Sequence, residues 1–441
     1  MQSPEEKGNH MPDLTTELIP ILQQHRLPDF DLGDEFIYPF YQGRSILNIP
    51  STICQLLGAP TLGTEALMGD YLSPLGLVGT GDLRSVVMVV MDALGLYTLK
   101  RWMEDGTAPI WKQLAAQGLL APLTSITPST TSAALPSLWT GRSATAHGIT
   151  GYEMWMKEYG VVANTILHAP ITFRGEAGTL AKAGFAPTEY LPAPTLGSHL
   201  AAHGVQCRAY QHHSIIRSGL SEMFFRDVQA RAFVSSADLW VNLRQYLESQ
   251  ADQRLYTWVY WSEVDTLSHR YGPENERTAA EFSSFSTAME KLFLNSLSDR
   301  ARQGTLLMLI ADHGQIATLP DPHYELRNHD SLLRRLHIYP TGENRLAYLF
   351  IRPGQTEAVR EYLERTWPNQ FFLVDSAYAL ESGLFGPGQR HPQVLDRLGD
   401  KMLIARNDAY LWWSAKENFM RGRHGGLSDR EMLVPFLAFR L

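Results

Sequence analysis

Six side chains that could bind metal ions are spread over four short segments of the chain. Aspartate and histidine without cysteine are the ligands expected of hydrolytic zinc or a similar divalent metal. Each segment alone is weak evidence, because an aspartate that follows a strand is more often a turn residue or a helix N-cap. The inference therefore depends on their combination. The six residues are Asp92, Asp265, His269, Asp312, His313 and His424.

The spacing within two of these segments allows both side chains to reach one ion. Asp265 and His269 are four residues apart, so both can reach one ion if the backbone between them makes a single helical turn. Asp312 and His313 are adjacent and would point in different directions from an extended strand. Where the backbone bends at the end of a strand, both can turn toward the same metal. The spacings are compatible with a metal site.

Three apolar runs that end at or shortly before an aspartate predict buried parallel strands. Helical patterns occur between them at residues 237–247 and 277–302. Strands that alternate with helices indicate an α/β fold with a mostly parallel sheet covered on both faces. Ligands of such sheets bind at the carboxyl ends of the strands, so the three aspartates should converge there. The runs are residues 85–91, 256–261 and 305–311, and the aspartates are Asp92, Asp265 and Asp312.

A segment of different pattern interrupts this alternation. An apolar run at residues 346–351, an amphipathic helix at 356–365 and a second run at 371–374 resemble a βαβ unit. We predict that this segment is an α+β cap inserted into the core. The predicted divisions are an N-terminal segment packed on the core (1–80), the catalytic α/β core (81–319), the cap (320–395) and the C-terminal part of the core (396–441).

The composition of the 441-residue chain limits the classes of partner. A net charge of −8 argues against binding to a nucleic-acid polymer or an anionic membrane, and a hydrophobic content of 44% is enough for a globular core. The two cysteines, Cys54 and Cys207, have no spacing typical of disulfides or thiolate metal sites. The polar start of the chain lacks a signal-peptide pattern, and no apolar run is long enough to span a membrane. We expect a cytoplasmic protein, and its oligomeric state is open.

A segment rich in proline and threonine at residues 127–149 completes the set of motifs. It contains a Thr-Gly pair at 140–141 and a His-Gly-Ile sequence at 147–149. Together with the metal segments, in this order and spacing, it resembles the type I phosphodiesterase and nucleotide pyrophosphatase family of the alkaline phosphatase superfamily. In that family the nucleophile is a threonine nine residues before the Thr-Gly pair. The nucleophile here is then Thr131, with Thr130 as the competing choice.

The resemblance covers the chain from about residue 85 to its C-terminal end. It implies an alkaline phosphatase-like fold and a site with two divalent metal ions, zinc or manganese. Thr131 would attack phosphorus while one metal favours its alkoxide form, and the second metal would deliver hydroxide to release the phosphothreonine. The implied substrate is a small phosphorylated molecule. The implied ligands are Asp92, Thr131, Asp312 and His313 for one ion, and Asp265, His269 and His424 for the other.

The resemblance does not specify the substrate, because two features of many nucleotide-cleaving members are missing. Those members have an aromatic residue directly after the nucleophile and an asparagine shortly afterwards. This chain has Ser132 and Ala134 at those positions. Base stacking and a hydrogen bond to a phosphate oxygen would then need other residues. The candidates are Tyr152 and Trp155 for stacking, and Arg142 and Lys157 for the phosphate oxygen.

The expected activity is cleavage of a phosphodiester or pyrophosphate bond, with a nucleotide-like substrate as one option. Phosphonoacetate hydrolase-like and phosphomonoesterase activities are alternatives, as is a non-catalytic metal-binding protein of the same fold. Neither cysteine lies in a Cys-x-Pro-x-Arg type motif, which argues against a sulfatase, and the surroundings of Thr131 argue against a phosphomutase. His147 is expected to be structural. The glycine-rich residues 76–81 precede a strand, which argues against a dinucleotide site.

Overall fold

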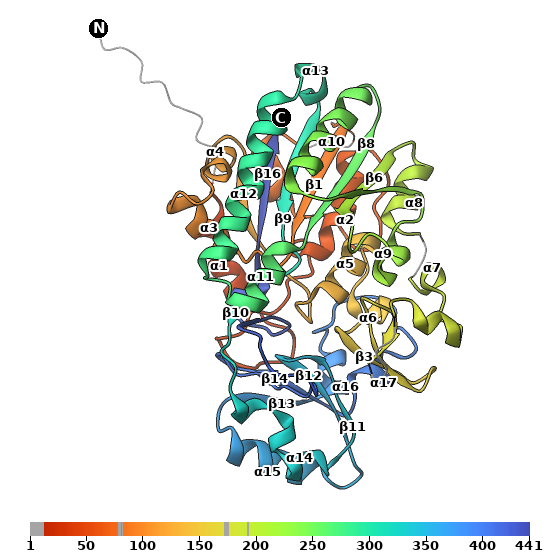
Figure 1. The fold of residues 1–441 in the computed structure, drawn as a ribbon, viewed down its shortest axis with the longest axis vertical. Coiled ribbons are helices and arrows are strands. Elements are labelled where there is room, and N and C mark those ends of the chain that lie inside the picture. Colours follow the sequence, from red (N-terminus) through yellow and green to blue (C-terminus); the bar gives the residue numbers. More distant parts are fainter. Residues whose placement is uncertain (1–12, 78–80, 82, 172–175, 192–193) are drawn as a thin grey trace.

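A seven-stranded sheet forms the centre of the computed structural model, with the strand order β2-β16-β9-β1-β8-β6-β7 (Figure 1). Its neighbouring strands are parallel except at β16, which runs antiparallel to β2 and β9. The predicted mostly parallel sheet is confirmed. The strands are β1 (Ser85–Met91), β2 (Leu119–Thr124), β6 (Gln206–His212), β7 (Val228–Phe233), β8 (Leu255–Trp261), β9 (Thr305–Ile310) and β16 (Leu433–Arg440). The structure describes residues 13–77, 81, 83–171, 176–191 and 194–441.

Strands β9, β1 and β8 lie side by side at the centre of this sheet and correspond to the three predicted strands. All of their residues are buried, which explains their continuous apolar runs. In the parallel register Met91 pairs with Trp261, and Val90 pairs with Ile310. The three strands therefore end at the same edge of the sheet, and the segments that follow them start close together.

Helices cover both faces of the central sheet, as the sequence predicted. On one face, Trp258 of β8 packs against Trp139 of α5, with ring centroids 5.0 Å apart. On the other face, Trp261 of β8 packs against Phe285 of α12, with centroids 4.8 Å apart. Because successive residues of a strand point to opposite faces, residues three positions apart serve both layers. The helices of the core include α2 (Ile49–Leu56), α3 (Leu96–Glu104), α4 (Pro109–Gln117), α5 (Thr131–Thr140), α8 (Leu196–Ala202), α10 (Ser236–Ser249), α11 (Glu263–Tyr271) and α12 (Glu276–Leu292).

One of the two predicted helices differs from its prediction. The pattern at residues 237–247 is α10, as expected, but the helix predicted at 277–302 is interrupted. α12 ends before two short helical elements, and Leu294 and Leu297 in the interruption are buried. Leaving the helix turns these apolar side chains into the core. The short elements are η5 (Leu294–Ser296) and α13 (Asp299–Arg302).

A second, antiparallel seven-stranded sheet lies below the core in Figure 1, with the order β13-β14-β12-β11-β3-β4-β5. The predicted βαβ unit is β12, α15 and β13, and β14 lies between its two strands. The sheet extends along the chain beyond the predicted cap, residues 320–395, in both directions. Its outlying strands have two to five residues, too few for a clear sequence pattern. The elements are β3 (Glu153–Met156), β4 (Val161–Asn164), β5 (Ala169–Pro170), β11 (Leu336–Glu343), β12 (Leu346–Ile351), α15 (Thr356–Thr366), β13 (Phe371–Asp375) and β14 (Lys401–Ala405).

The described part of the N-terminal segment packs on both sheets. Helix α1 (Thr15–Gln24) contacts β2, and α2 contacts α5. Leu22 and Phe36 belong to a hydrophobic cluster that also contains residues of β12 and β14. Residues 1–12, at the polar start of the chain, and residues 78–80 of the glycine-rich segment lie outside the described residues.

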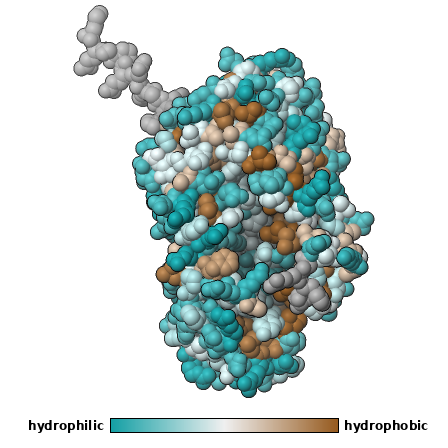
Figure 2. Space-filling model, viewed as in Figure 1, coloured by the Kyte–Doolittle hydropathy of each residue, from teal (hydrophilic) through white to brown (hydrophobic). Residues whose placement is uncertain are grey.

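The surface combines polar and apolar residues. On the face shown in Figure 2, hydrophilic residues surround small, separate groups of hydrophobic ones. Among the described residues, no helix has the length and apolar character needed to cross a membrane.

Candidate active site

The first group of candidate residues lies where the central strands end. Asp92 directly follows β1, and its N–H still donates to the carbonyl of Trp261 at 3.0 Å. The next residue, Ala93, has a positive φ of 61°, so the chain turns sharply there. The N–H of Ala93 donates to Oδ1 of Asp312, 3.2 Å away. The turn therefore brings together two aspartates that follow neighbouring strands.

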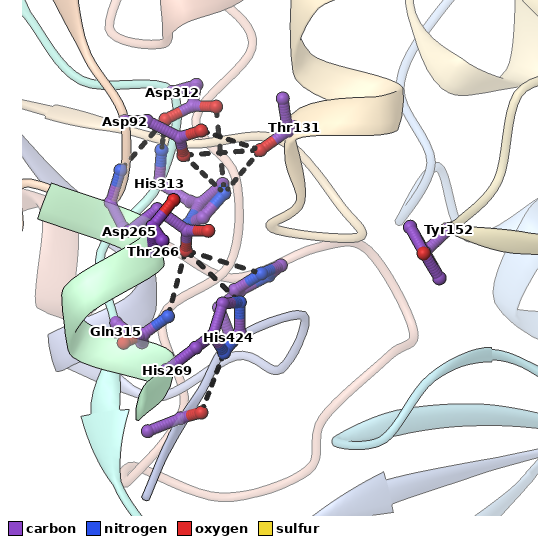
Figure 3. A network of polar contacts seen from close by, with 12 residues as sticks. Asp92, Thr131, Tyr152, Asp265, Thr266, His269, Asp312, His313, Gln315 and His424 are labelled. Carbon is purple, nitrogen blue, oxygen red and sulfur yellow. Dashed lines mark hydrogen bonds and ion pairs between the residues drawn. The ribbon is translucent and has the colours of Figure 1, made fainter. Parts of the chain in front are cut away.

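Thr131 is the first residue of α5, and its hydroxyl lies against this group. Its Oγ1 atom is 3.2 Å from Oδ1 of Asp92 and 3.1 Å from Nε2 of His313 (Figure 3). Thr130 before it has extended backbone with a φ of −146°, so the helix starts at Thr131 itself. Thr131 is 8% exposed, whereas His313 is fully buried. Both side chains are therefore buried, and the imidazole is the more enclosed of the two.

The second group of candidate residues lies on α11 and on the loop that carries His424. Helix α11 begins just after β8, which places Asp265 in its first turn and His269 one turn later. Nε2 of His269 is 3.2 Å from Oδ1 of Asp265, as their spacing suggested. Nε2 of His424 approaches the same oxygen at 3.8 Å. The ring of His424 stacks on that of His313, with centroids 4.0 Å apart, so the two groups adjoin.

A backbone carbonyl holds each of the three histidines at one ring nitrogen. A carbonyl only accepts hydrogen bonds, so Nδ1 carries the proton and Nε2 of the neutral ring carries a lone pair. All three Nε2 atoms lie near carboxylate oxygens, which also carry lone pairs. A metal ion satisfies both kinds of atom, and this mode of support is usual for metal-binding histidines. The pairs are His313 with Gly314 (2.9 Å), His269 with Gly422 (2.8 Å) and His424 with Ser129 (3.1 Å).

Burial makes the charges of this site unfavourable unless a cation neutralises them. Burial, followed by the charges of Asp312 and Asp265, holds the pKa of Asp92 well above its usual range. Burial also raises the pKa of Asp265. Burial and the neighbouring His313 hold the pKa of His424 well below its usual range, so this ring is neutral. Oδ2 of Asp312 is buried without a hydrogen-bond partner among the described residues. The donor set therefore fits a metal ion.

Two overlapping sets of donors could each hold an ion. Within each set the ligand atoms lie within 4.8 Å of one another, and His313 belongs to both. The family resemblance assigned His313 to one ion only, so its shared position is an addition from the structure. Oxygen and imidazole donors suit a divalent metal. The sets are Asp92, Asp312 and His313, and Asp265, His313 and His424.

Three further residues around the site were not singled out from the sequence. The hydroxyl of Tyr260, near the end of β8, donates to Oδ2 of Asp92. Nε2 of Gln315 donates to Oδ1 of Asp265 at 2.9 Å. Both residues lie in or next to the segments that end the central strands. Their polar side chains at these positions could therefore have linked them to the site from the sequence alone. Glu343 comes from the second sheet, and no sequence pattern connected it with the site.

A buried ion pair between the two sheets supports two loops that carry candidate ligands. Arg345, between β11 and β12, makes bonds of 2.8 and 3.0 Å to the carboxylate of Glu431, and both side chains are fully buried. The same carboxylate accepts from the N–H of Gly426 at 2.8 Å. The Glu431 carbonyl accepts from the N–H of Gly314 at 2.8 Å. These glycines follow candidate histidines by two residues and one residue, so the pair fixes both loops.

The remaining residues considered from the sequence have other surroundings. Lys157 is bonded to Asp396 at 2.9 Å at the surface. His147 is fully buried, and its Nε2 lies 3.1 Å from the hydroxyl of Ser137. Tyr152 is 40% exposed, and Figure 3 shows it beyond Thr131 from the candidate ligands. Arg142 and Trp155 are half-buried.

Comparisons with known proteins give one family and several similar folds. The family model described as type I phosphodiesterase / nucleotide pyrophosphatase matches residues 86–427. Murine ectonucleotide pyrophosphatase/phosphodiesterase 5 has 17% sequence identity and a TM-score of 0.59, with 80% of this chain and 87% of that chain covered. Phosphonoacetate hydrolase from Sinorhizobium meliloti 1021, in complex with phosphonoformate, also has 17% identity and a TM-score of 0.59, with 81% and 90% covered. A search of curated proteins found no match.

Proposed function

Because the chain belongs to the type I phosphodiesterase/nucleotide pyrophosphatase family, we propose that it is a two-metal phosphohydrolase that cleaves a phosphodiester or pyrophosphate bond of a small molecule. The observation that carries this proposal is the position of Oγ1 of Thr131, 3.2 Å from Asp92 and 3.1 Å from His313. A threonine hydroxyl is thus held against a buried set of metal-type donors. A small substrate with a phosphoryl or phosphonyl group also suits two similar structures: an inactive variant of murine ectonucleotide pyrophosphatase/phosphodiesterase 5 is in complex with AMP, and the phosphonoacetate hydrolase is in complex with phosphonoformate.

The two proposed metal sites use the seven residues that the sequence suggested. The metals would lower the pKa of the threonine hydroxyl and neutralise charge on the phosphoryl oxygens. Zinc is the first choice and manganese the second, because the donors are imidazoles and carboxylates. The assignment is Asp92, Thr131, Asp312 and His313 at one site, and Asp265, His269 and His424 at the other, with His313 adjoining both.

Thr131 acts as the nucleophile in this proposal. Its Oγ1 forms a bond to phosphorus, the bond from phosphorus to the leaving oxygen breaks, and the leaving oxygen departs with the electron pair and takes up a proton. Water then cleaves the phosphothreonine, which restores the hydroxyl and releases the phosphorylated product. Asp92 and His313 would hold the metal ion that positions Oγ1, because both groups are hydrogen-bond acceptors and cannot bond the deprotonated oxygen directly.

The N-terminal end of α5 supplies donors for the substrate. The first N–H groups of a helix, here at Thr131 and Ser132, have no carbonyl partner within the helix. They favour an oxyanion close to the nucleophile. These main-chain groups can take over part of the function of the missing asparagine, because they do not depend on the side chain at Ala134.

The activity can be tested with a panel of p-nitrophenyl phosphomonoesters and phosphodiesters, dinucleotides and phosphonoacetate. The protein should be assayed after loading with zinc or manganese and after chelation. We expect diester or pyrophosphate cleavage that disappears on chelation and returns with metal. Cleavage of phosphonoacetate alone would replace the proposal with the phosphonate-cleaving alternative. Full metal loading with no turnover of any compound would support a non-catalytic protein.

The nucleophile can be identified by trapping the covalent intermediate. Rapid acid quench during turnover should give a peptide from residues 127–149 with one added phosphoryl group. Fragmentation should place that group on Thr131 and not on Thr130. A phosphoryl group on Thr130, or turnover with no phosphopeptide, would contradict the assigned mechanism.

A further inference from the structure

A fully buried arginine lies next to the last candidate ligand. Arg423 directly precedes His424 and is 1% exposed. Its guanidinium group donates to Oγ1 of Thr318 at 2.6 Å, to the carbonyl of Met420 at 3.0 Å and to Oδ1 of Asn418. The side chain therefore joins two segments that are far apart along the chain.

The flat face of this guanidinium group packs on an aromatic ring. Its central carbon, Cζ, lies 3.7 Å from the ring centroid of Tyr410, which is close enough for a cation–π contact. The hydroxyl of Tyr410 donates to the carbonyl of Leu319 at 3.1 Å and accepts from Nδ2 of Asn418 at 2.9 Å. The ring and the guanidinium group therefore hold the same two segments together.

Arg423 differs from the other two fully buried arginines of the described residues in its lack of an acidic partner. Arg345 pairs with Glu431 at 2.8 Å. Arg397 pairs with Glu158 at 2.7 Å. Among the residues that the structure describes, no carboxylate forms an ion pair with Arg423. A buried charge without a counter-charge is costly, so the hydrogen bonds of this side chain point to a role beyond filling space.

The short strand that contains Arg423 touches helix α11. This strand, β15 (Gly422–Arg423), pairs with β10 (Ile316–Ala317). A Cβ added to Gly422 would lie 2.5 Å from the carbonyl oxygen of Ser268, so the backbone of β15 lies directly on α11. Any displacement of β15 therefore changes its contacts with this helix.

Two groups of the second set of candidate ligands depend on the position of β15. The carbonyl of Gly422 accepts from Nδ1 of His269 at 2.8 Å, which leaves Nε2 of that ring free to bind an ion. His424 follows β15 directly, and its Nε2 lies 3.8 Å from Oδ1 of Asp265 (Figure 3). The acids of the first set instead follow the central strands β1 and β9.

We propose that Arg423 is a positioning residue for the second metal ion, the one assigned to Asp265, His269 and His424. Its hydrogen bonds and its contact with Tyr410 fix β15. In turn, β15 fixes the ring of His269 and the backbone of His424. The inference rests on the proposed two-metal function and names a residue outside the ligand set on which one of the two ions depends.

Metal affinities of two arginine variants test the proposal. Arg423→Met keeps the length of the side chain and removes its hydrogen bonds. By competition with a chelator, we expect the affinity for the second ion to fall about 10–100-fold and that for the first ion to change less than about threefold. The control is Arg397→Met, because Arg397 is equally buried but forms its ion pair with Glu158. It should weaken neither ion selectively.

Two backgrounds identify the ion that is affected. Asp265→Asn leaves the first ion, and Asp92→Asn leaves the second. Addition of Arg423→Met should lower the affinity of the remaining ion only in the Asp92→Asn background. An equal loss in both backgrounds, or no loss in either, would overturn the inference. Neither outcome changes the binding of two ions by the wild-type protein, so the proposed function would stand.

The ring of His269 gives a readout that needs no metal. In the metal-free wild-type protein at neutral pH, nitrogen NMR should show the ring proton on Nδ1, because the carbonyl of Gly422 accepts it. Arg423→Met should weaken this preference, and Arg397→Met should retain it. An unchanged preference in Arg423→Met would contradict the positioning role. A wild-type protein that binds no metal, but whose ring tautomer depends on Arg423, would refute the proposed function and confirm that Arg423 orients this ring.

A milder change keeps the test decisive if Arg423→Met does not fold. Thr318→Val removes the hydroxyl that Arg423 bonds and keeps the shape of the side chain. The affinity for the second ion should fall in the same direction but less. The matched control is Thr341→Val, because the Thr341 hydroxyl is buried without a hydrogen-bond partner among the described residues. Equal affinities in the two threonine variants would overturn the proposal.

Discussion

Oγ1 of Thr131 lies 3.1 Å from Nε2 of His313, while Nδ1 of the same ring lies 2.9 Å from the carbonyl of Gly314. The carbonyl fixes the proton on Nδ1, so the nitrogen nearest to the threonine is an acceptor. The carboxylate of Asp92 is a second acceptor, at 3.2 Å. One hydroxyl proton cannot satisfy both. The surroundings of the threonine are therefore arranged for a positive ion.

Removing the hydroxyl should abolish turnover without removing the metals. Thr131→Ala is expected to lower kcat about 10³-fold or more, as loss of a nucleophile does. Thr131→Ser should keep measurable activity. Metal content, measured by mass spectrometry of the purified variants, should stay close to that of the wild type. An Ala variant with undiminished kcat would refute the role of Thr131.

Removing one ligand group should affect one ion more than the other. Asp265→Asn and His269→Ala are each expected to lower occupancy from about two ions per chain to about one, because both residues are assigned to the same single ion. The histidine control is His337→Ala, at an exposed position of β11. Equal occupancy in all variants would contradict the assigned sites, and loss of both ions would show that they bind as a unit.

The hydrogen bond from Tyr260 to Asp92 should strengthen metal binding. Tyr260→Phe removes only this hydroxyl and is expected to weaken metal affinity about 10–100-fold, as loss of a group that orients a ligand does. Tyr256→Phe is a matched control, since Tyr256 is on the same face of β8 and its hydroxyl has no partner among the described residues. Competition with a chelator measures both affinities. A smaller effect for Tyr260 than for Tyr256 would disprove this role.

Breaking the ion pair between the two sheets should destabilise the protein. Glu431→Gln leaves Arg345 buried without its counter-charge and is expected to lower the free energy of unfolding by about 3–5 kcal/mol. Replacing both residues, as Arg345→Met with Glu431→Leu, should recover much of this loss. Urea unfolding of metal-free protein measures the stability. Metal affinity of the double variant should stay low, because Gly426 loses its acceptor.

His147 should make stability depend on pH. Burial, with the charges of His391 and Arg397, lowers its pKa to about 3 in the folded protein. The unfolded chain binds this proton below about pH 6.5 while the folded chain does not, so stability falls as pH drops from about 6.5 toward 3, by up to about 1.4 kcal/mol per pH unit. His147→Gln should flatten this slope by about one proton in urea titrations. An unchanged slope would show that the ring does not stay neutral.

The central sheet was predictable because its strands carry a strong and simple signal. Ser85–Met91 and the two strands beside it are almost entirely apolar and fully buried, since helices cover both of their faces. Because these strands are easy to recognise in the sequence, the aspartates that follow them could also be predicted as site residues. The prediction of one helix over residues 277–302 was wrong at Leu294 and Leu297. The chain leaves the helix there because these two side chains are buried in the core.

The second sheet and its contribution to the site were much harder to see in the sequence. Strands as short as Ala169–Pro170 have no usable periodicity, and β14 pairs with β12 from more than 50 residues away. Glu343, at the end of β11, meets the N–H of Tyr152 and the backbone of Gly425 through such tertiary contacts. The candidate ligands could be predicted from local sequence motifs. The residues around them that would select a substrate could not, because tertiary structure brings them to the site. The roles of both sets stay predictions until they are measured.

Strand β16 lies between β2 and β9, although β2 is completed more than 300 residues before it along the chain. During synthesis, the hydrogen-bonding edges of both neighbours are exposed until residues 433–440 have been made. Such edges invite pairing with other chains. Production of this protein should therefore be sensitive to chaperones and to truncation after residue 432. A shortened chain would keep all of the candidate ligands and still fail to assemble the sheet that brings them together.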